Sequence, residues 1–323
     1  MSAAHQAHSR LEHFPISFFA IVMGLAGTTI AVEKAQQIWG WSSTFGLAML
    51  ALTALAYACV AATYLLKLAT HPKEVVAEFN HPIRMSFFPA SSIGMILLAI
   101  ASLEHYPTIA LYLWAMGSGV QLLFTLVILS DWLHHEKFQI QHSNPAWFIP
   151  IVGNILVPVA GAPLGFHEVS WFYFSVGLMM WIPLLAVLLN RFFFHPMMPG
   201  KLLPTLFILI APPAVAFISW VKLHNGAIDD TARILFYFGL FTTLLLFAQM
   251  KYFVKVQFAL PWWAYSFPMA AITIASMMML EKVGGVFFTW LAPILMAMLL
   301  LLIVVLVFNT IRAMLRGEIC IPE

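Results

Sequence analysis

Apolar stretches alternate with short polar segments along the whole chain of 323 residues. Each stretch is bounded by charged or turn-forming residues and comes close to the ~20 residues that an α-helix needs to cross a bilayer. The ten stretches cover 14–32, 45–66, 84–103, 107–130, 145–163, 168–190, 201–221, 231–252, 261–280 and 286–312. This pattern predicts an all-α membrane protein with ten transmembrane helices.

Proline recurs at the start of every odd-numbered stretch, at spacings of 67, 63, 59 and 57 residues, which indicates five helix pairs. The five positions are Pro15, Pro82, Pro145, Pro204 and Pro261. In four pairs a further proline follows within the same stretch, at Pro89, Pro150, Pro212 (with Pro213) and Pro268. Proline kinks free backbone polar groups, which a membrane tolerates only against protein or a water-filled cavity. The kinked helices are therefore expected around a common axis.

The odd-numbered stretches also differ in composition from the even-numbered ones. They carry small and polar residues such as Gly24, Gly27, Ser92, Asn154 and Thr273, whereas the even ones are more uniformly apolar. The difference favours an inner ring of five kinked helices surrounded by five lipid-facing helices. Small residues that only allow close helix packing are the alternative interpretation.

Composition restricts the class of protein. Hydrophobic residues make up 62% of the chain and charged residues 9%, with a mean hydropathy of +0.93. These values indicate a polytopic membrane protein, because ordinary globular domains are roughly one quarter charged. The net charge is only +2, and the basic residues are scattered, so nothing supports a nucleic-acid partner. We predict a membrane domain over 14–312, with cytoplasmic tails at 1–13 and 313–323.

Lysine and arginine set the expected orientation through their bias toward cytoplasmic loops. With a cytoplasmic N-terminus, the cytoplasmic side holds eleven of them: Arg10, Lys67, Lys73, Arg84, Lys137, Arg191, Lys201, Lys251, Lys255, Arg312 and Arg316. The opposite side holds four, which are Lys34, Lys222, Arg233 and Lys282. Both termini are therefore predicted to be cytoplasmic.

No Asp, Glu, Lys or Arg lies in the middle of a predicted span, and the twelve histidines fall in tails, loops or helix ends. Proton-coupled transporters and haem bundles usually keep such groups at depth. The sequence thus predicts neither an enzyme nor a metal or other cofactor. An uncharged path suits a conduit that binds its ions weakly. Carbonyl groups freed by proline would favour cations, whereas exposed N–H groups and Arg84 would favour anions. Taken together, these features slightly favour an anion over a cation as the conducted ion.

Two segments resemble a known family: EFNHPIRMSFFPASSIG at 78–94 and PWWAYSFPMAAITIAS at 261–276. The family joins the bacterial tellurite-resistance protein TehA to plant slow-type anion channels and, more distantly, to fungal C4-dicarboxylate transporters. The similarity begins at HFPISFFAIVMGLAG and continues through HSNPAWFIPIVGN. It implies five helical hairpins in a quasi-fivefold array around one pore per subunit, three subunits per assembly and residence in a bacterial inner membrane.

The resemblance also implies site residues. In the family a phenylalanine of the ninth helix occludes the pore, and Phe267 occupies that place in the motif WWAYSFP. Arg84 and Lys255 would attract anions at the cytoplasmic mouth. The alternative for Arg84 is a topology anchor or a partner for Glu78, and Lys255 has the same two interpretations. Candidate pore-lining residues are Phe18, Phe19, Phe87, Phe88, Phe148, Phe207 and Ser266.

The first stretch departs from the TehA pattern, because Val22 and Met23 stand where that pattern has a proline before Gly-Leu-Ala. We expect a kink there to depend on Gly24 and Gly27 instead. This variant also occurs in the transporter-like branch of the family.

Two functions follow from the sequence. The preferred one is a passive channel for small monovalent anions, such as chloride or nitrate, closed by Phe267. The alternative is a secondary transporter of C4-dicarboxylates, or an exporter linked to tellurite resistance. A divalent substrate should require a cation deep in the membrane, and none is predicted.

Overall fold

The computed structural model describes residues 10–321, which contain helices and no strand. The predicted tails extend into residues 1–9 and 322–323, which lie outside the described part. Within it, nine helical segments are long and apolar enough to cross a membrane. Their bounds are Ile16–Trp39, Ser43–Thr70, Arg84–Ser102, Pro107–His134, His167–Phe194, Gly200–Leu223, Asp230–Phe247, Leu260–Lys282 and Val286–Leu315. The predicted all-α membrane class is thereby confirmed.

The fifth predicted helix differs from expectation, because the apolar segment Pro145–Gly161 is shorter than the other nine and is broken. It consists of η4 (Pro145–Phe148), α7 (Ile149–Leu156) and α8 (Pro158–Gly161). Pro158 has no N–H to donate, and the Val157 N–H bonds the Asn154 carbonyl at 3.2 Å with three-residue spacing. The tenth span, predicted over 145–163, is therefore not confirmed, because this proline interrupts the segment.

Every inner segment begins as a 3-10 helix and continues as an α-helix. The pairs are η1 (Ile16–Phe18) with α2 (Phe19–Trp39), η2 (Arg84–Phe87) with α5 (Ala90–Ser102), η4 with α7, η5 (Gly200–Ile210) with α10 (Ala211–Leu223), and η6 (Leu260–Tyr265) with α13 (Ser266–Lys282). Pro89 is the N-cap of α5, and Pro150, Pro212 and Pro268 lie in the first turns of α7, α10 and α13. Proline is tolerated there because those N–H groups have no intrahelical partner.

The first inner helix has no such proline, and its break lies before the expected glycines. α2 runs without interruption from Phe19 to Trp39, across Gly24 and Gly27. The change from 3-10 to α geometry falls at Phe18 and Phe19. The glycines instead form a close contact with α13, described below.

The outer helices are long and more exposed than the inner ones. They are α3 (Ser43–Thr70), α6 (Pro107–His134), α9 (His167–Phe194), α11 (Asp230–Phe247) and α14 (Val286–Leu315). In their apolar stretches 22–44% of the residues are buried, against 72–89% in the four long inner segments. The short helices α4 (Pro72–Asn80) and α12 (Met250–Phe253) were not expected from the sequence, and α11 ends at Phe247, earlier than predicted.

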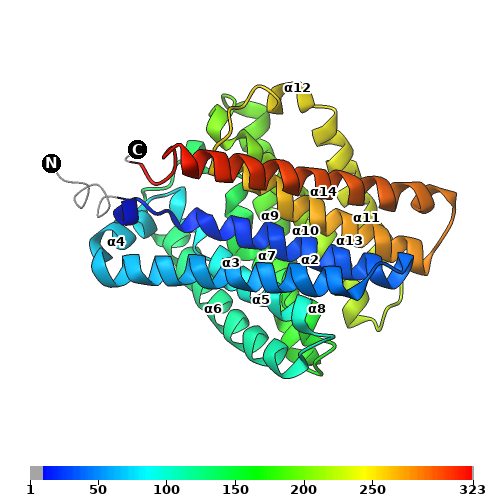
Figure 1. Cartoon of the computed structure of the whole chain (residues 1–323). Helices are drawn as coiled ribbons and strands as arrows, with labels where there is room; N and C mark the ends of the chain where they lie inside the picture. The colour runs from blue at the N-terminus through cyan, green and yellow to red at the C-terminus, as the bar shows by residue number, and fades with distance from the viewer. Residues whose placement is uncertain (1–9, 322–323) are drawn as a thin grey trace.

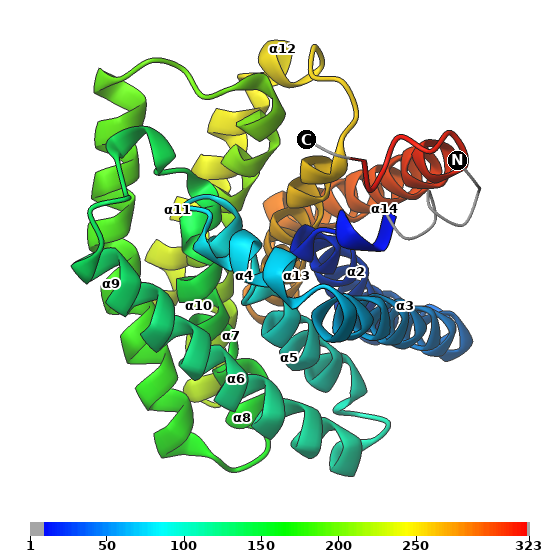
Figure 2. The ribbon, with the colours of Figure 1, turned by 90° about the vertical axis from the view of Figure 1, so that its left-hand side faces the viewer.

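The helices pack in sequential pairs around a closed set of inner contacts. Each inner helix contacts the outer helix that follows it, as α2 does with α3 and α13 with α14 (Figure 1). The inner helices contact one another in the order α2, α5, α7, α10 and α13, and α13 packs against α2 again. Viewed along the bundle, α3, α6, α9 and α14 lie toward the outside (Figure 2). Arg10 lies beside Gly317, so both described ends of the chain lie at one end of the bundle.

Candidate functional site

All five inner segments line one small cavity of about 40 Å³. Its lining residues are Ala20 and Met23, Phe87 and Ile93, Ile149 and Val152, Ile208 and Ala211, and Trp263, Ala264, Phe267 and Pro268. Every one of these side chains is apolar. The cavity lies beside the transitions from 3-10 to α-helix, since each segment contributes residues from the turns around its transition.

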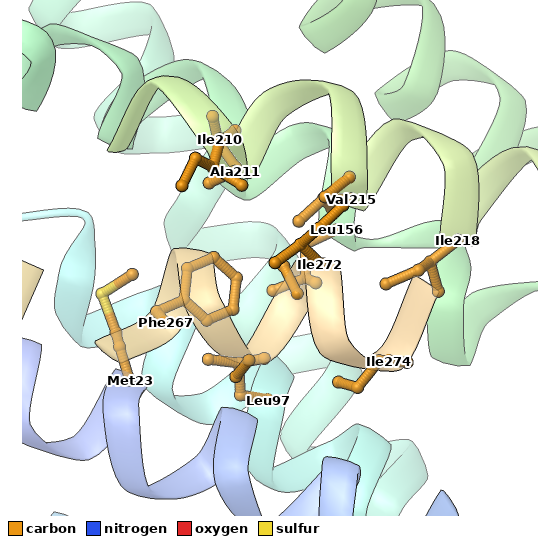
Figure 3. Packing of buried hydrophobic residues seen from close by; sticks show 14 of the residues in the cluster. Met23, Leu97, Leu156, Ile210, Ala211, Val215, Ile218, Phe267, Ile272 and Ile274 are labelled. Atoms are coloured by element: carbon orange, nitrogen blue, oxygen red, sulfur yellow. The ribbon is translucent and has the colours of Figure 1, made fainter. Parts of the chain in front are cut away.

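Phe267 forms part of the cavity wall from the first turn of α13. The side chain is buried, with 6% of the residue exposed. Its ring extends from α13 toward Ala211 of α10, with Met23 and Leu97 on the opposite side (Figure 3). The labelled residues farther along α7, α10 and α13, such as Leu156 and Val215, are apolar as well. The ring thus occupies the narrow space between the inner helices in an apolar environment.

The WWAYSFP motif directs its side chains toward different neighbours. The Trp263 Nε1–H donates to Thr310 Oγ1 of α14 at 2.9 Å. The Tyr265 ring packs edge-on against Phe207, with 4.7 Å between centroids. The Ser266 hydroxyl donates to the Trp263 carbonyl at 2.6 Å. These contacts fix the turn from which Phe267 projects.

Two glycines of α2 bring that helix into close contact with the turn that carries Phe267. A Cβ atom at Gly24 would clash with the Ser266 side chain. One at Gly27 would lie 2.9 Å from Ala270 Cβ and 3.3 Å from Phe267 Cδ2. Neither position has space for a larger residue unless α13 moves. The first inner helix therefore sets the position of Phe267 through close steric contact.

The other predicted lining residues are distributed around the bundle. Among the candidates, Phe87 lines the cavity together with Phe267. Phe19 packs against Tyr57 and Tyr64 of α3, and Phe88 against Tyr64, Phe79 and Phe124. Phe18 stacks on Phe14, and Phe207 packs against Phe247, Phe253 and Tyr265. Phe148 is buried in the core. Ser266 faces Gly24. The cavity wall described here includes none of these six.

The carbonyl of Pro150 accepts three side-chain hydrogen bonds, a cluster that sequence reasoning missed. Gln121 Nε2–H donates to it at 2.8 Å, Thr125 Oγ1–H at 3.0 Å and Asn154 Nδ2–H at 2.9 Å. Gln121 also accepts from Ser92 Oγ at 2.7 Å, and its carboxamide fills the space that Gly153 leaves. All four polar side chains are buried. The polar residues of three helices thereby hold α7 in place. Their isolated positions within apolar stretches were the feature of the sequence that could have indicated this cluster.

The predicted basic residues lie at the end of the bundle that contains both described chain ends. Arg84 and Lys255 are exposed. The backbone N–H groups of Ile83 and Arg84 donate to His81 Nδ1 at 3.2 and 3.3 Å. In the pattern His-Pro-x-Arg the histidine thus acts as a local cap for the turn that begins η2.

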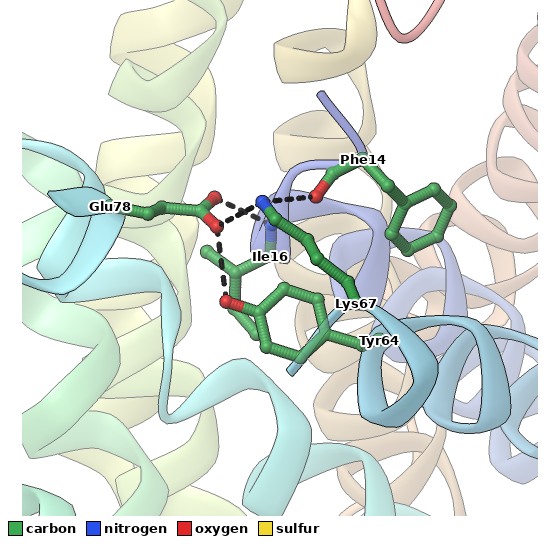
Figure 4. A network of polar contacts seen from close by, with 5 residues as sticks. All are labelled: Phe14, Ile16, Tyr64, Lys67 and Glu78. Carbon is green, nitrogen blue, oxygen red and sulfur yellow. Dashed lines mark hydrogen bonds and ion pairs between the residues drawn. The ribbon is translucent and has the colours of Figure 1, made fainter. Parts of the chain in front are cut away.

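Glu78 lies in a buried ion pair that sequence reasoning missed. Its carboxylate accepts from Lys67 Nζ at 3.0 Å, Tyr64 OH at 3.0 Å and the Ile16 N–H at 2.8 Å (Figure 4). Lys67 also donates to the Phe14 carbonyl at 2.8 Å. The Lys67 and Glu78 side chains are each 4% exposed. This network fixes the start of the first inner helix to α3 and α4.

In the described part of the chain, the nine long apolar helices, which pack around a shared cavity, define a multi-pass α-helical membrane protein. The chain belongs to the SLAC1 family, described as voltage-dependent anion channels, whose family model matches residues 13–311. The predicted family resemblance is thereby confirmed, and the membership supports anion transport.

Similar proteins come from plants, archaea and bacteria. The chain is 29% identical over 286 residues to the S-type anion channel SLAH2 of Arabidopsis thaliana, covering 85% of this chain and 54% of that protein. An uncharacterized transporter of Methanocaldococcus jannaschii is 27% identical, with 86% and 87% covered. A tellurite resistance protein TehA homolog of Haemophilus influenzae is 25% identical, with 80% and 79% covered. The chain spans about half the length of the plant relatives it matches.

Proposed function

We propose that this protein is a passive channel for small monovalent anions, such as chloride or nitrate, with Phe267 as its gate. One observation carries the proposal: in a chain of an anion-channel family, residues from all five inner segments line one cavity, and Phe267 forms part of its wall. The apolar lining suits a constriction that excludes hydrated ions by size and by dewetting. A change in the position of the Phe267 ring would then open the path.

The proposed pore follows the axis of the inner helices. The closed order of contacts among α2, α5, α7, α10 and α13 supports a quasi-fivefold array of five hairpins. We count the broken segment Pro145–Gly161 as the tenth crossing, which agrees with both described chain ends lying at one end of the bundle. The 3-10 to α transitions at Pro89, Pro150, Pro212 and Pro268 would lie around the narrowest part.

The remaining parts of the proposal rest on the charge bias and on the family resemblance. They are a membrane domain over 14–312 with cytoplasmic tails at 1–13 and 313–323, residence in a bacterial inner membrane, and a homotrimer with one pore per subunit. Arg84 and Lys255, exposed at the proposed cytoplasmic mouth, would raise the local anion concentration there. No cofactor takes part in this function.

Ion-substitution electrophysiology on the native protein and on Phe267→Ala tests the gate. We expect the alanine variant to give currents at least about tenfold larger, because it removes the ring from the constriction. The reversal potential should follow the anion gradient when chloride or nitrate is replaced by a large organic anion. Unchanged current in Phe267→Ala would exclude this ring as the gate.

Phe88→Ala is the matched control for Phe267→Ala. Phe88 also directly precedes a kink proline, Pro89, but its ring packs outward against Phe79, with 4.8 Å between centroids. The two variants therefore remove the same side chain from the same local motif. Phe88→Ala should lower stability without increasing the current, and an equal increase would mean that loosened packing alone opens the path.

A coupled C4-dicarboxylate transporter, or a tellurite exporter, is the competing function. A divalent substrate would meet only apolar side chains among the residues lining the cavity, and a buried divalent ion without a cationic partner is strongly disfavoured. Saturable, proton-dependent malate uptake into proteoliposomes without ohmic current would favour the transporter. Sustained ohmic anion current would favour the channel.

A further inference from the structure

Four of the five inner segments end in charged residues at the end of the bundle opposite the described chain ends. These residues are Glu33 and Lys34 in α2, Glu104 shortly after α5, Lys222 in the last turn of α10, and Glu281 and Lys282 at the end of α13. We call this group the outer-mouth cluster. The inner helices run in one direction, so their charged ends gather around the outer opening of the proposed pore.

Hydrogen bonds and an ion pair join three of these ends. Lys34 Nζ pairs with Glu281 Oε2 at 2.8 Å, which connects α2 with the gate helix α13. Lys34 Nζ also donates to Gln37 Oε1 at 3.2 Å. The Gln37 amide in turn donates to Glu104. The carboxylates of Glu281 and Glu104 therefore already have partners, and so does the Lys34 ammonium.

Lys222 and Lys282 complete the cluster as exposed cations. Lys222 lies within electrostatic reach of Lys34, Glu104, Glu281 and Lys282. A Cβ atom at Gly226, just after α10, would lie 3.9 Å from Lys282 Nζ, so the ends of α10 and α13 are neighbours. Within residues 10–321, neither Lys222 nor Lys282 has an ion-pair partner within 4.0 Å. Their positive charges are therefore not neutralised by a direct ion pair.

We propose that Lys222 and Lys282 form an anion-capture site for small inorganic anions at the outer mouth. The inference rests on the proposed channel function, whose ions must pass this opening. Two ammonium groups raise the local anion concentration, while the carboxylates of Glu104 and Glu281, within electrostatic reach of Lys222, keep the positive potential modest. Weak binding of this kind is what conduction requires.

Currents through the opened channel provide the first test. In the Phe267→Ala background, Lys222→Gln should lower the current of anions that enter from the outer side by at least about twofold at ~0.02 M salt, where screening is weak. Near 1 M salt, where the Debye length is about 3 Å, the difference should vanish. Arg233→Gln is the matched control, because Arg233 belongs to the same side but to the outer helix α11. It should leave the current unchanged.

A second measurement reports the electrostatic potential without any current. Ala227 is exposed in the loop after α10. An Ala227→Cys probe, made with Cys59 and Cys320 replaced by alanine, reacts with an anionic and with a cationic methanethiosulfonate reagent. Replacing Lys222 and Lys282 together by glutamine should lower the ratio of anionic to cationic rates by roughly threefold at low salt. Arg233→Gln should not change this ratio.

The two measurements separate failure of this inference from failure of the proposed function. If Phe267→Ala gives no anion current but the reagent ratio falls as expected, the gate is wrong and the capture site stands. If Phe267→Ala conducts and Lys222→Gln changes neither the current nor the reagent ratio, the capture site is wrong. A current loss that is the same at low and high salt would also overturn it, because a structural effect is not screened.

Discussion

The first and third inner helices, α2 and α7, reach their places in the ring by different means. α7 has Pro150 in its first turn and Pro158 two residues after its end, and three side chains donate to the Pro150 carbonyl. α2 has no kink proline, and its start is held from outside by the buried Glu78 carboxylate, which accepts from the Ile16 N–H. Its middle packs against α13, which carries the proposed gate residue Phe267, through Gly24 and Gly27.

The difference shows which parts of the ring are fixed by directional bonds. Hydrogen bonds from Gln121 and Thr125 restrict both the distance and the orientation of α7 relative to α6. Close packing of glycine against small side chains restricts only how near α2 and α13 can come to each other, and not their relative orientation. We therefore expect the α2–α13 contact to control the gate and the α6–α7 contact to control stability.

The largest effect is expected from Lys67→Met, which tests the external anchor of α2. Without Lys67 the buried Glu78 carboxylate loses its cationic partner, and removal of one member of a buried ion pair costs about 3–5 kcal/mol. Thermal unfolding of the purified protein measures this loss. Lys73→Met, at an exposed position of α4, is the control. A loss no larger than that of the control would mean that the ion pair does not anchor α2.

Gly24→Ala should give the next largest effect and tests the steric contact with the gate. The added methyl group clashes with Ser266, and such overpacking costs about 1–3 kcal/mol. Because the strain falls on the turn before Phe267, current should rise together with the loss of stability. Gly119→Ala on α6, where a Cβ would meet nothing within 4 Å, should change neither.

A second substitution sharpens the Gly24 experiment. Ser266→Gly combined with Gly24→Ala moves the bulk from one side of the contact to the other, and it should restore most of the closed state. Failure of this rescue would show that α2 acts on the gate by some route other than contact with Ser266.

Gln121→Leu tests the directional side of the comparison. The variant keeps most of the volume beside Gly153 but removes the hydrogen bonds to Pro150 and Ser92. Hydrogen bonds between membrane helices contribute about 1–2 kcal/mol at most, so the melting temperature should fall modestly. The current should remain at the native level. A rise in current comparable to that of Gly24→Ala would contradict the division between the two contacts.

The smallest effect is expected at Asp229, the N-cap of α11, which belongs to neither helix of the comparison. The Ala232 N–H, and then the Trp220 Nε1–H, donate to this carboxylate and hold its pKa below the ordinary value of 3.8. A carboxyl group whose pKa is lowered by folding stabilises the folded protein at pH values above its ordinary pKa. This contribution is lost as the pH falls through the pKa of the folded state. Asp229→Ala should therefore lower the melting temperature at neutral pH, and the difference should shrink in acid.

Asp229→Asn is the control for the pH dependence, because asparagine caps helices without titrating. Its melting temperature should show less dependence on acid pH than that of the native protein. A difference between native protein and Asp229→Ala that stays constant from neutral to acid pH would rule out the titration.

The helices could largely be predicted from the sequence, because span length and proline position are local properties. Nine spans followed from apolar length alone, whereas the fifth broke at Pro158, a second proline that the apolar pattern conceals. The inner segments, which the sequence distinguishes by their small and polar residues, are also the segments with the larger buried share. The two properties agree because polar residues within a membrane are tolerated where protein surrounds them.

The site was less predictable, because the direction of each side chain depends on the rotation of its helix. Phe87 and Phe88 are neighbours in the sequence, yet Phe87 lines the cavity and Phe88 packs against the outer helices. Neither apolar pattern nor composition separates them. The partners of Gln121 and Glu78 lie on other helices, so their hydrogen bonds required the three-dimensional packing.

The 3-10 segment η6, which directly precedes α13, would become shorter if it were rewound as an α-helix. A 3-10 helix rises about 2.0 Å per residue and an α-helix about 1.5 Å. Conversion of the six residues of η6 into α-helix would therefore shorten the segment by roughly 3 Å and rotate its side chains, because the number of residues per turn rises from about 3.0 to 3.6. Phe267 follows immediately after this segment. Conversion of this one short segment would thus translate the Phe267 ring along the bundle axis without breaking a covalent bond or moving an outer helix.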